Sequence, residues 1–276
     1  KDPLIKNYNE TSIIKENNNE NNYNNYDNNQ EIMRSPRMKQ MCGLLGKSTS
    51  YIGGKENNKK EGFGIQTWNN GAKFKGYYAN DKVNGIGMLI TGEDSYIGEF
   101  ENFGASGYGC YTKGDNLKYE GYWKNDSQET YGIEIWKDGS KYKGEYQKGK
   151  KHVIGVYLWA SDGSLYEGEW KDNKLDGFGI CYYLKNDRIY LGQWKNNNKE
   201  GFGQYVSEGK KYIGYYYRDK KEGFGIYYRK NNNDAYMGFW KEGNMFGFGK
   251  YMNSKKTKFG KWKENKQIDW FNNEEE

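Results

Sequence analysis

Aromatic, glycine and polar positions alternate in a recurring order along most of the chain after residue 51. Each repeat opens with Tyr-x-Gly-x-aromatic, as in Tyr166-Glu-Gly168-Glu-Trp170. A Gly-x-Gly signature, here Gly177-Phe-Gly179, begins eleven residues after the opening aromatic, and successive repeats are spaced by 22 to 24 residues. Because the side chains of a strand alternate between its two faces, this pattern predicts two short strands in every repeat.

The links between these strands consist of turn residues. Asp138-Gly139 lies between two repeats, and an Asn run from Lys195 to Lys199 lies within one. Such residues supply the positive φ that tight hairpins need, and nothing in the repeated region has helical periodicity. The sequence therefore predicts an all-β fold. It is an elongated single-layer antiparallel β-meander of about nine and a half repeats, with a disordered N-terminal segment.

The repeats divide the chain into three parts. Residues 1–47 form an Asn-rich, low-complexity segment that has almost nothing apolar to bury, so we expect it to be disordered. Residues 48–262 form the repeat array, and residues 263–276 form an acidic C-terminal tail. Within a repeat, the first, third and fifth positions of Tyr-x-Gly-x-aromatic share one strand face. We expect a ring from a neighbouring strand to lie over the bare glycine between them.

Tyr-x-Gly-x-Trp followed by Gly-x-Gly, in register over residues 51–262, resembles the MORN (membrane occupation and recognition nexus) repeat family. The resemblance implies an elongated β-sheet without catalytic activity of its own. Similar arrays serve as scaffolds in membrane junctions, ciliary spokes and protist membrane skeletons, or as regulatory segments of larger enzymes. The sequence departs from the pattern at Lys55, Thr130, Val153 and Lys258, and we expect altered sheet curvature at Thr130 and Val153 and irregular ends.

Composition narrows the class of protein further. Of 276 residues, 18% are aromatic and 38 are glycine, which excludes collagen, a coiled coil and a wholly disordered chain. No apolar run approaches the roughly 20 residues of a membrane span, and no signal peptide is evident. Three scattered cysteines indicate a reducing, intracellular compartment. Lys1 in place of a methionine leaves open that the chain is a regulatory piece of a larger enzyme.

The sequence offers few parts for catalysis. His152 is the only histidine, so histidine-based triads and polyhistidine metal sites lack their components. Carboxylate pairs such as Glu167 and Glu169 lie on the face opposite the aromatic slot, as expected of a solvated strand face. We predict no catalytic residues, no metal site and no cofactor.

The fifth-position aromatics run down the array as a column, which has two interpretations. They stack to hold neighbouring hairpins together, or part of the column lines an apolar groove for an amphipathic helix of a partner protein. The groove candidates are Trp123, Tyr146, Trp170, Trp194, Tyr216 and Trp240.

On the opposite face, the positions flanking the first glycine change character along the array. They are mostly charged or polar in repeats two to six and apolar in repeats seven to nine. An exposed apolar strip usually marks an interface, so we predict a protein-binding or self-association surface there. The alternative is that the tail, with Trp270 and Phe271, folds back over the strip. The candidates are Leu191, Ile213, Tyr215, Met237 and Phe239.

Positive charge concentrates near the C-terminus. Residues 195–266 hold 17 Lys and Arg against 7 Asp and Glu, whereas the whole chain has a net charge of +6. These residues either keep the turns solvated or contact an anionic membrane surface. Nucleic acid is not expected because no reading helix is present. The anionic-surface candidates are Lys210, Lys211, Arg218, Lys220, Lys221, Arg229 and Lys230.

Together with the resemblance to MORN arrays, which implies a cytoskeletal, ciliary or membrane-skeleton assembly, these features predict a non-enzymatic scaffold that binds other proteins. The expected location is the cytoplasm, the cytoskeleton, a cilium or the cytoplasmic face of a membrane. The alternatives are a peripheral module that binds anionic phospholipids and a regulatory segment of a larger enzyme.

Overall fold

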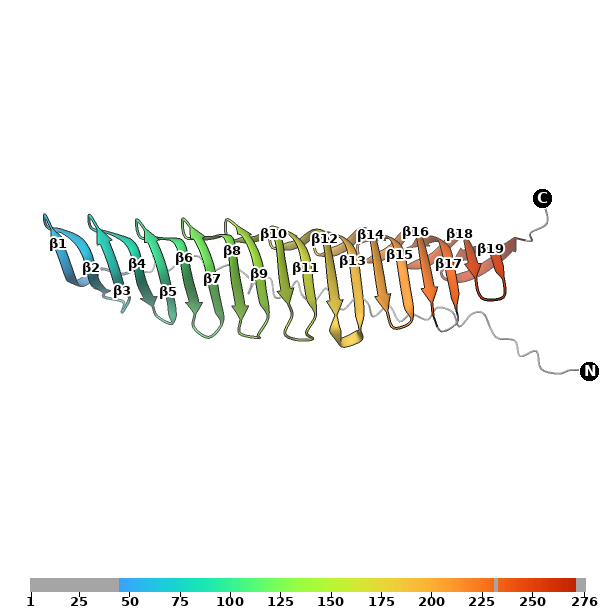
Figure 1. Ribbon diagram of the computed structural model, residues 1–276, viewed down its shortest axis with the longest axis horizontal. Coiled ribbons are helices and arrows are strands. Elements are labelled where there is room, and N and C mark those ends of the chain that lie inside the picture. Colours follow the sequence, from blue (N-terminus) through green and yellow to red (C-terminus); the bar gives the residue numbers. More distant parts are fainter. Residues whose placement is uncertain (1–44, 231–232, 272–276) are drawn as a thin grey trace, which may run out of the picture. The chain divides into compact units, whose positions relative to one another are not determined.

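The computed structural model describes residues 45–230 and 233–271. Within them the chain forms two compact units, which we describe separately. The N-terminal unit contains residues 45–187 and the turn at 195–197, and the C-terminal unit contains residues 188–194, 198–230 and 233–271. In each unit the strands form a single antiparallel layer in chain order (Figure 1). The predicted all-β meander is therefore confirmed.

Twenty strands make up the two units. Those of the N-terminal unit are β1 (Ser48–Glu56), β2 (Lys59–Trp68), β3 (Lys73–Ala79), β4 (Lys82–Thr91), β5 (Asp94–Glu101), β6 (Gly104–Lys113), β7 (Leu117–Lys124), β8 (Ser127–Trp136), β9 (Lys141–Gln147), β10 (Lys150–Leu158), β11 (Leu165–Lys171) and β12 (Lys174–Tyr183), followed by the 3₁₀ turn η3 (Leu184–Asn186). Those of the C-terminal unit are β13 (Arg188–Lys195), β14 (Asn198–Ser207), β15 (Lys210–Tyr217), β16 (Lys220–Arg229), β17 (Asp234–Lys241), β18 (Asn244–Met252), β19 (Thr257–Lys263) and β20 (Lys266–Phe271).

The hairpin turns inside each repeat also tie that repeat to the one before it. Asn80 and Asp81 both have positive φ, 47° and 67°, as a two-residue hairpin with the right-handed twist of its strands requires. The Asp81 carboxylate then accepts the backbone N–H of Lys60 at 2.8 Å. Asp126 accepts the N–H of Ala105 in the same way at 2.7 Å. Asn and Asp in these turns therefore set both the hairpin and its register with the preceding repeat.

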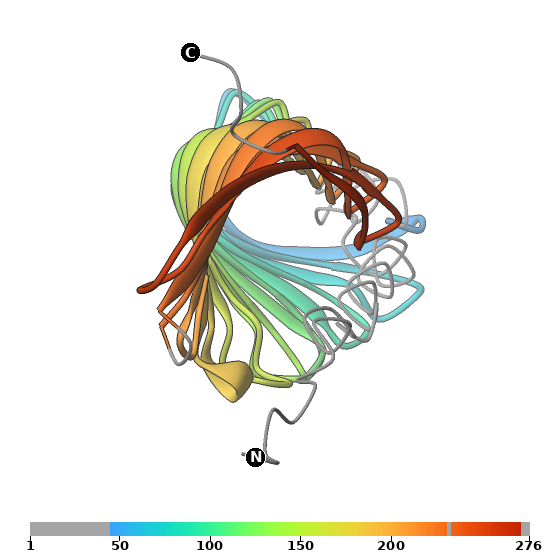
Figure 2. The same cartoon turned by 90° about the vertical axis from the view of Figure 1, so that its right-hand side faces the viewer.

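The first glycine of each Gly-x-Gly lies in a β-bulge. Gly168 pairs with Gly179 and Trp170 with Leu175, so three residues of β12 lie opposite Glu169 alone. Gly177 there has a φ of 113°, a conformation that L side chains rarely adopt. Bulges bend a strand and increase its twist, and the strands of each unit are visibly curved when seen end-on (Figure 2). The repeated glycine thus adopts, without strain, the backbone conformation of the bulge that curves the strand.

Thr130 and Val153 occupy this bulge position without being glycine. Their φ values are 55° and 57°, and Gly121–Gly132 and Gly144–Gly155 pair as in the other repeats. The expected change in curvature at these repeats is therefore wrong: the bulge persists, and the backbone strain falls on a β-branched residue.

Val153→Gly should consequently stabilise the protein. Val153 is exposed, so its side chain contributes little burial, while a non-glycine residue with left-handed φ costs roughly 1–2 kcal/mol. We expect a gain of about 1 kcal/mol in the free energy of unfolding, measured by urea denaturation followed by tryptophan fluorescence. Val153→Ala, which keeps the Cβ, is the matched control and should gain less. Equal stability of Val153→Gly and the native chain would contradict this interpretation.

The repeat array continues past residue 262, where we predicted that the tail begins. Strand β20 pairs with β19 through Gly260 and Trp270. The Trp270 ring lies over Gly260, in the role that the opening Tyr plays in other repeats and that Lys258 does not fill. Trp270 also packs edge-to-face on Trp262, with ring centres 5.6 Å apart. The first part of the tail therefore caps the sheet, while residues 272–276 and the Asn-rich residues 1–44 lie outside the described residues.

Candidate functional site

On the inner face of the repeats, the opening tyrosine, or Phe74 in one repeat, packs over two glycines. A Cβ on Gly109 would lie 2.5 Å from Cζ of Tyr96, and a Cβ on Gly98 would lie 2.5 Å from the Gly109 Cα. The Tyr96 hydroxyl donates a hydrogen bond to the carbonyl of Glu99 at 3.0 Å. That carbonyl lies opposite the bulge, where the ladder is interrupted. The ring thus comes from the same strand as the first glycine, not from a neighbouring strand as we predicted.

These tyrosines join successive repeats through edge-to-face packing. The ring centre of Tyr96 lies 5.0 Å from that of Phe100 in its own repeat and 5.4 Å from that of Trp123 in the next. In the C-terminal unit Tyr212 contacts Tyr216 and Trp240 in the same manner, each at 5.3 Å. Such pairs contribute about 0.5–1.5 kcal/mol each beyond the area that they bury.

This packing removes the predicted groove. The six fifth-position candidates are only 3–6% exposed. Neighbouring repeats cover their rings, which therefore present no open surface. Of the two interpretations, stacking is the correct one for Trp123, Tyr146, Trp170, Trp194, Tyr216 and Trp240.

Two of the predicted anionic-surface residues are not free at the surface. Lys221 is buried, and its ammonium lies 5.1–5.4 Å from the ring centres of Tyr212, Tyr227 and Trp240. Arg229 forms a two-pronged ion pair with buried Asp234, with Nε to Oδ1 at 2.9 Å and Nη2 to Oδ2 at 2.5 Å. The Asp234 hydrogen bond raises the pKa of Arg229. For Lys221 the surface prediction is wrong because its side chain lies inside the sheet. Arg229 is partly exposed, and its guanidinium is held by Asp234.

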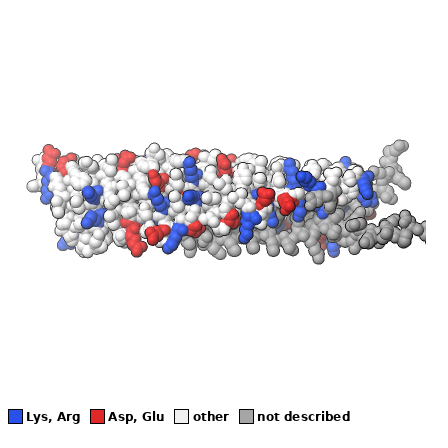
Figure 3. Space-filling view, turned by 60° about the horizontal axis from the view of Figure 1, so that its bottom comes forward, with Lys and Arg blue, Asp and Glu red and all other residues white. Residues whose placement is uncertain are grey.

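The other basic candidates lie at the surface in different settings. Lys220 pairs with Glu242, and the Arg218 guanidinium lies 5.2 Å from the Tyr217 ring centre. Lys210, Lys211 and Lys230 line a hollow of about 530 Å³ at the edge of the C-terminal unit. In the N-terminal unit, at the left of Figure 3, residues of both signs are interspersed on the face shown.

The outer face of the C-terminal unit carries an exposed row of aromatic side chains. Two positions of the repeat lie side by side on this face. One is the residue between the glycines of Gly-x-Gly, and the other is the fourth residue of the next Tyr-x-Gly-x-aromatic motif. Phe202 and Tyr215 pack edge-to-face at 5.5 Å, and Phe224 and Phe239 at 5.9 Å. Each member of the row is 44–59% exposed. We call the following residues of β14–β18 the outer aromatic row: Phe202, Tyr215, Phe224, Phe239 and Phe248.

The predicted apolar strip overlaps this row only in part. Tyr215 and Phe239 belong to the row, whereas Ile213 and Met237 lie partly buried beside it, and Leu191 is exposed on β13. The sequence interpretation missed the residues between the glycines: Phe202, Phe224 and Phe248. Strand alternation from the second glycine, which faces inward, could have placed them on the outer face.

The described tail contacts the row at Phe248 but leaves its other members uncovered. Trp270 packs on the inner face against Trp262, and the Phe271 ring approaches Phe248, at 5.7 Å between centres. Neither Trp270 nor Phe271 buries the outer aromatic row, which stays exposed within the described residues.

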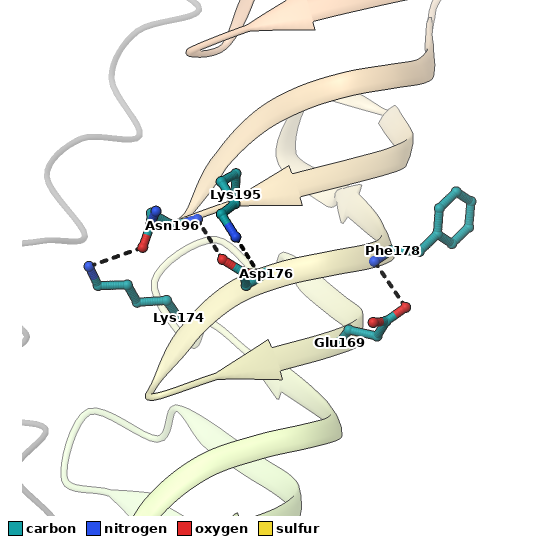
Figure 4. A network of polar contacts seen from close by, with 6 residues as sticks. All are labelled: Glu169, Lys174, Asp176, Phe178, Lys195 and Asn196. Atoms are coloured by element: carbon teal, nitrogen blue, oxygen red, sulfur yellow. Dashed lines mark hydrogen bonds and ion pairs between the residues drawn. The ribbon is translucent and has the colours of Figure 1, made fainter.

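In the N-terminal unit, carboxylates interrupt the corresponding row. The Glu169 carboxylate accepts the backbone N–H of Phe178 at 3.1 Å, which closes the bulge, and the Phe178 ring points away (Figure 4). Beside it, Lys195 pairs with Asp176 at 3.2 Å (Figure 4). The Glu99 carboxylate likewise accepts the backbone N–H of Tyr108 at 2.9 Å. Tyr215 and Phe239 replace such carboxylates in the C-terminal unit, which makes its row continuous.

Lysines lie among these exposed rings. The ammonium groups of Lys250 and Lys261 lie 5.5 Å and 5.8 Å from the ring centres of Phe259 and Phe248. The Lys241 ammonium lies 5.4 Å from the ring of Phe246. Cation–π contacts of this kind keep the basic groups against the aromatic surface. The outer face of β17–β19 is therefore both aromatic and basic.

Groups suited to metal chemistry are scarce in the part of the chain that the structure describes. There, no cluster of three or more His, Cys, Asp or Glu side chains could hold a metal ion. His152 lies within β10. Among the same described residues, no helix has the length and apolar character needed to cross a membrane.

Comparison with known proteins identifies the repeat. A family model described as the MORN repeat matches residues 51–73, 119–141, 142–164, 166–188, 190–209, 212–234 and 236–256. No curated protein matches the chain. Among solved structures, the SAS-4 (dCPAP) TCP domain of Drosophila melanogaster, in complex with a proline-rich motif of Ana2 (dSTIL), is 12% identical. The match covers 59% of this chain and 88% of that chain with a TM-score of 0.35, too low to support an argument about function.

Proposed function

Because this chain belongs to the MORN-repeat family, we propose that it is a non-enzymatic scaffold that binds other proteins through the outer face of its C-terminal unit. The assembly that we propose for it is a cytoskeletal, ciliary or membrane-skeleton structure. Imaging of the tagged protein in its own cell tests that location, and a diffuse distribution would contradict it.

One observation supports the binding surface above the others. The outer aromatic row places five large rings on five consecutive strands, each about half exposed. At about 4.8 Å between strands, the row extends roughly 19 Å. Aromatic residues dominate the energetics of protein interfaces, and monomeric proteins rarely leave such rings exposed in a contiguous patch.

The charges beside the row favour one kind of partner. Lys241, Lys250 and Lys261 lie against exposed rings of this face. Glu222 lies on β16, and its carboxylate accepts the N–H of Glu242 at 2.9 Å. We therefore expect a partner segment that offers apolar side chains together with carboxylates, since complementary charge steers and orients binding.

The experiment compares two matched double variants. Phe224→Ser with Phe239→Ser removes a cross-strand pair from the row. Phe63→Ser with Tyr77→Ser removes an equivalent pair, with ring centres at 5.6 Å, from β2 and β3. Both lose one exposed aromatic pair of about 0.2–1 kcal/mol, so their stabilities should fall equally. Affinity for the bound partner should fall at least about tenfold in the first variant only.

Parallel affinity capture with mass spectrometry, followed by titration of the captured protein, gives the readout. Support requires a partner that the native chain and the Phe63/Tyr77 variant retain and the Phe224/Phe239 variant loses. If the partner is a second copy of the chain, light scattering will show the same difference in mass. Retention of the same partners by all three proteins would overturn the proposal.

A second candidate function rests on the basic hollow. Lys210, Lys211 and Lys230 line it together, and such clusters attract anionic lipid head groups. Co-sedimentation with phosphatidylserine-containing vesicles should then be lost in the triple change of these lysines to Gln. It should also weaken between low and physiological salt. Vesicle binding that is the same in the triple variant as in the native chain, and the same at low and physiological salt, would exclude this function.

A further inference from the structure

Several bulges of the outer face have a backbone N–H that a side chain of the same repeat accepts. The Glu169 carboxylate accepts the N–H of Phe178 at 3.1 Å (Figure 4). The side-chain oxygen of Gln193 accepts the N–H of Phe202 at 2.8 Å. In both repeats the acceptor is the fourth residue of Tyr-x-Gly-x-aromatic, and the donor is the residue between the glycines of Gly-x-Gly. A carboxylate or amide oxygen is therefore the native ligand of this N–H.

The bulge glycine makes room for that ligand. A Cβ on Gly177 would overlap Oε2 of Glu169. A Cβ on Gly107 would likewise lie 2.5 Å from Oε2 of Glu99. The acceptor thus occupies the space that a side chain at the bulge would fill, and a glycine there leaves a place for a carboxylate.

In β18 the same place is open. Gly247 lies in the bulge with a positive φ of 69°. The fourth residue of its repeat is Phe239, whose ring has no oxygen to accept the N–H of Phe248. Among the described residues, a Cβ on Gly247 would meet no atom within 4 Å beyond its own chain neighbours. We call Gly247 and the N–H of Phe248 the open bulge.

The surroundings of the open bulge are aromatic and basic. The ammonium of Lys241 lies 5.4 Å from the ring centre of Phe246. That of Lys261 lies 5.8 Å from the ring centre of Phe248. The preceding repeat has Glu222 in the position of Phe246, so the open bulge lacks the acidic neighbour of the bulge in β16. These charges favour an anion as its ligand.

Strand β20 does not supply a carboxylate to the open bulge. Gly247 is paired in register with Trp262 of β19, and Trp262 is paired with Gln267 of β20. Asp269 of β20 pairs in register with Lys261 instead, two strands away from β18. Within the described residues, an acceptor for this N–H must therefore come from another molecule.

We propose that the open bulge binds the carboxylate of a glutamate side chain supplied by a partner protein. The carboxylate accepts the N–H of Phe248 over the bare Gly247, as that of Glu169 does in β12, and Lys241 and Lys261 attract it. Hydrogen bonds to an ionised acceptor are about twice as strong as those to a neutral one. The proposal rests on the proposed function and deepens it, because it gives the partner's acidic residue a contact atom beside the outer aromatic row.

The test uses the full chain labelled with ¹⁵N-phenylalanine and observed by amide NMR. The probe is N-acetyl-glutamate α-amide, and its neutral control is N-acetyl-glutamine amide. The glutamate probe should move the amide proton signal of Phe248 downfield at millimolar concentrations. It should bind about threefold or more tightly than the glutamine probe, because its acceptor is ionised. Phe178 should not respond, since Glu169 already fills its bulge.

Two variants of one residue separate the acceptor from the ring. Phe239→Glu supplies the chain's own carboxylate to the open bulge and should abolish the response of Phe248. Phe239→Leu, the matched control, supplies no acceptor and should keep it. If Phe239→Glu does not fold, which circular dichroism will show, the double change Lys241→Gln with Lys261→Gln should weaken binding of the glutamate probe at least about threefold.

Equal binding of the two probes would overturn the proposal. So would an equal response of Phe248 in folded Phe239→Glu and Phe239→Leu, or binding unchanged in the lysine double variant. Phe239→Leu removes a ring of the outer aromatic row and should weaken the captured partner, yet it should bind the glutamate probe as the native chain does. Failure of the open bulge and failure of the outer aromatic row are therefore distinguishable.

Discussion

Replacing Gly214 with alanine should lower the free energy of unfolding by at least about 3 kcal/mol. A Cβ there would lie 2.6 Å from the Gly225 Cα and 2.7 Å from Cζ of Tyr212, and it would also meet the Tyr212 hydroxyl. Neither the paired backbone nor the ring between two neighbours can move without breaking the stack. Gly223→Ala is the matched control: φ is 68° but the nearest atom lies 3.8 Å away, so only the left-handed strain of roughly 1–2 kcal/mol applies.

Urea denaturation measures both variants, and hydrogen exchange shows how far the damage spreads. In a repeat array each strand contacts only its neighbours. Protection should therefore fall in β15 and β16 and the adjoining hairpins of Gly214→Ala, while β1–β8 keep theirs. Equal costs for the two alanine variants would contradict the close-packing account, and uniform loss of protection would contradict the neighbour-limited account.

Removing one partner of the Glu134–Lys151 ion pair should have an equally large effect. The two side chains are 1–2% exposed, with Nζ and Oε2 3.2 Å apart, and the Tyr146 hydroxyl donates to Glu134 at 3.0 Å. Burial, and then the charge of Glu134, raises the pKa of Tyr146, so this hydroxyl remains a donor. Lys151→Met leaves the carboxylate buried without its cation, which costs about 3–5 kcal/mol.

The double change Glu134→Gln with Lys151→Met separates the charge from the packing. It removes both charges while an amide oxygen still accepts from Tyr146, so most of the lost stability should return. Thermal and urea unfolding of the native chain, the two single variants and the double variant form a complete cycle. A double variant as unstable as the sum of the singles would show that the pair is not coupled.

The sequence was sufficient for the fold because the repeat carries two independent signals. The 22–24-residue period defines the strands, and the alternation of Tyr166, Gly168 and Trp170 assigns their inner face. Both hold in the structure, since all three are buried. The turns were predictable for a related reason, because Asn and Asp occur where φ is positive.

The positions of the basic residues and of the bulge were not predictable in this way. Lys221 belongs to a charged run and looks solvent-exposed, but three rings from two repeats converge on its ammonium. Nothing local marks that convergence. At Val153 the missing glycine suggested a different curvature, yet the pairing of Gly144 with Gly155 imposes the bulge on it.

The outer surface was predicted at the correct end of the chain but with incomplete membership. The change from polar to apolar residues at the second and fourth positions identified Tyr215 and Phe239. The phenylalanines between glycines were read only as part of the repeat signature, although Phe202 and Phe224 form the other half of the same pairs. Tertiary pairing across strands, which a single repeat does not reveal, defines this row.

Hydroxyl-radical footprinting of the chain alone and with its captured partner tests the central claim most directly, because it reports the exposure of individual side chains. Binding through the outer aromatic row predicts that oxidation of Phe224 and Phe239 falls severalfold in the complex, while the matched pair Phe63 and Tyr77 is oxidised as before. Unchanged oxidation of Phe224 and Phe239 in a complex shown to be intact would contradict the account.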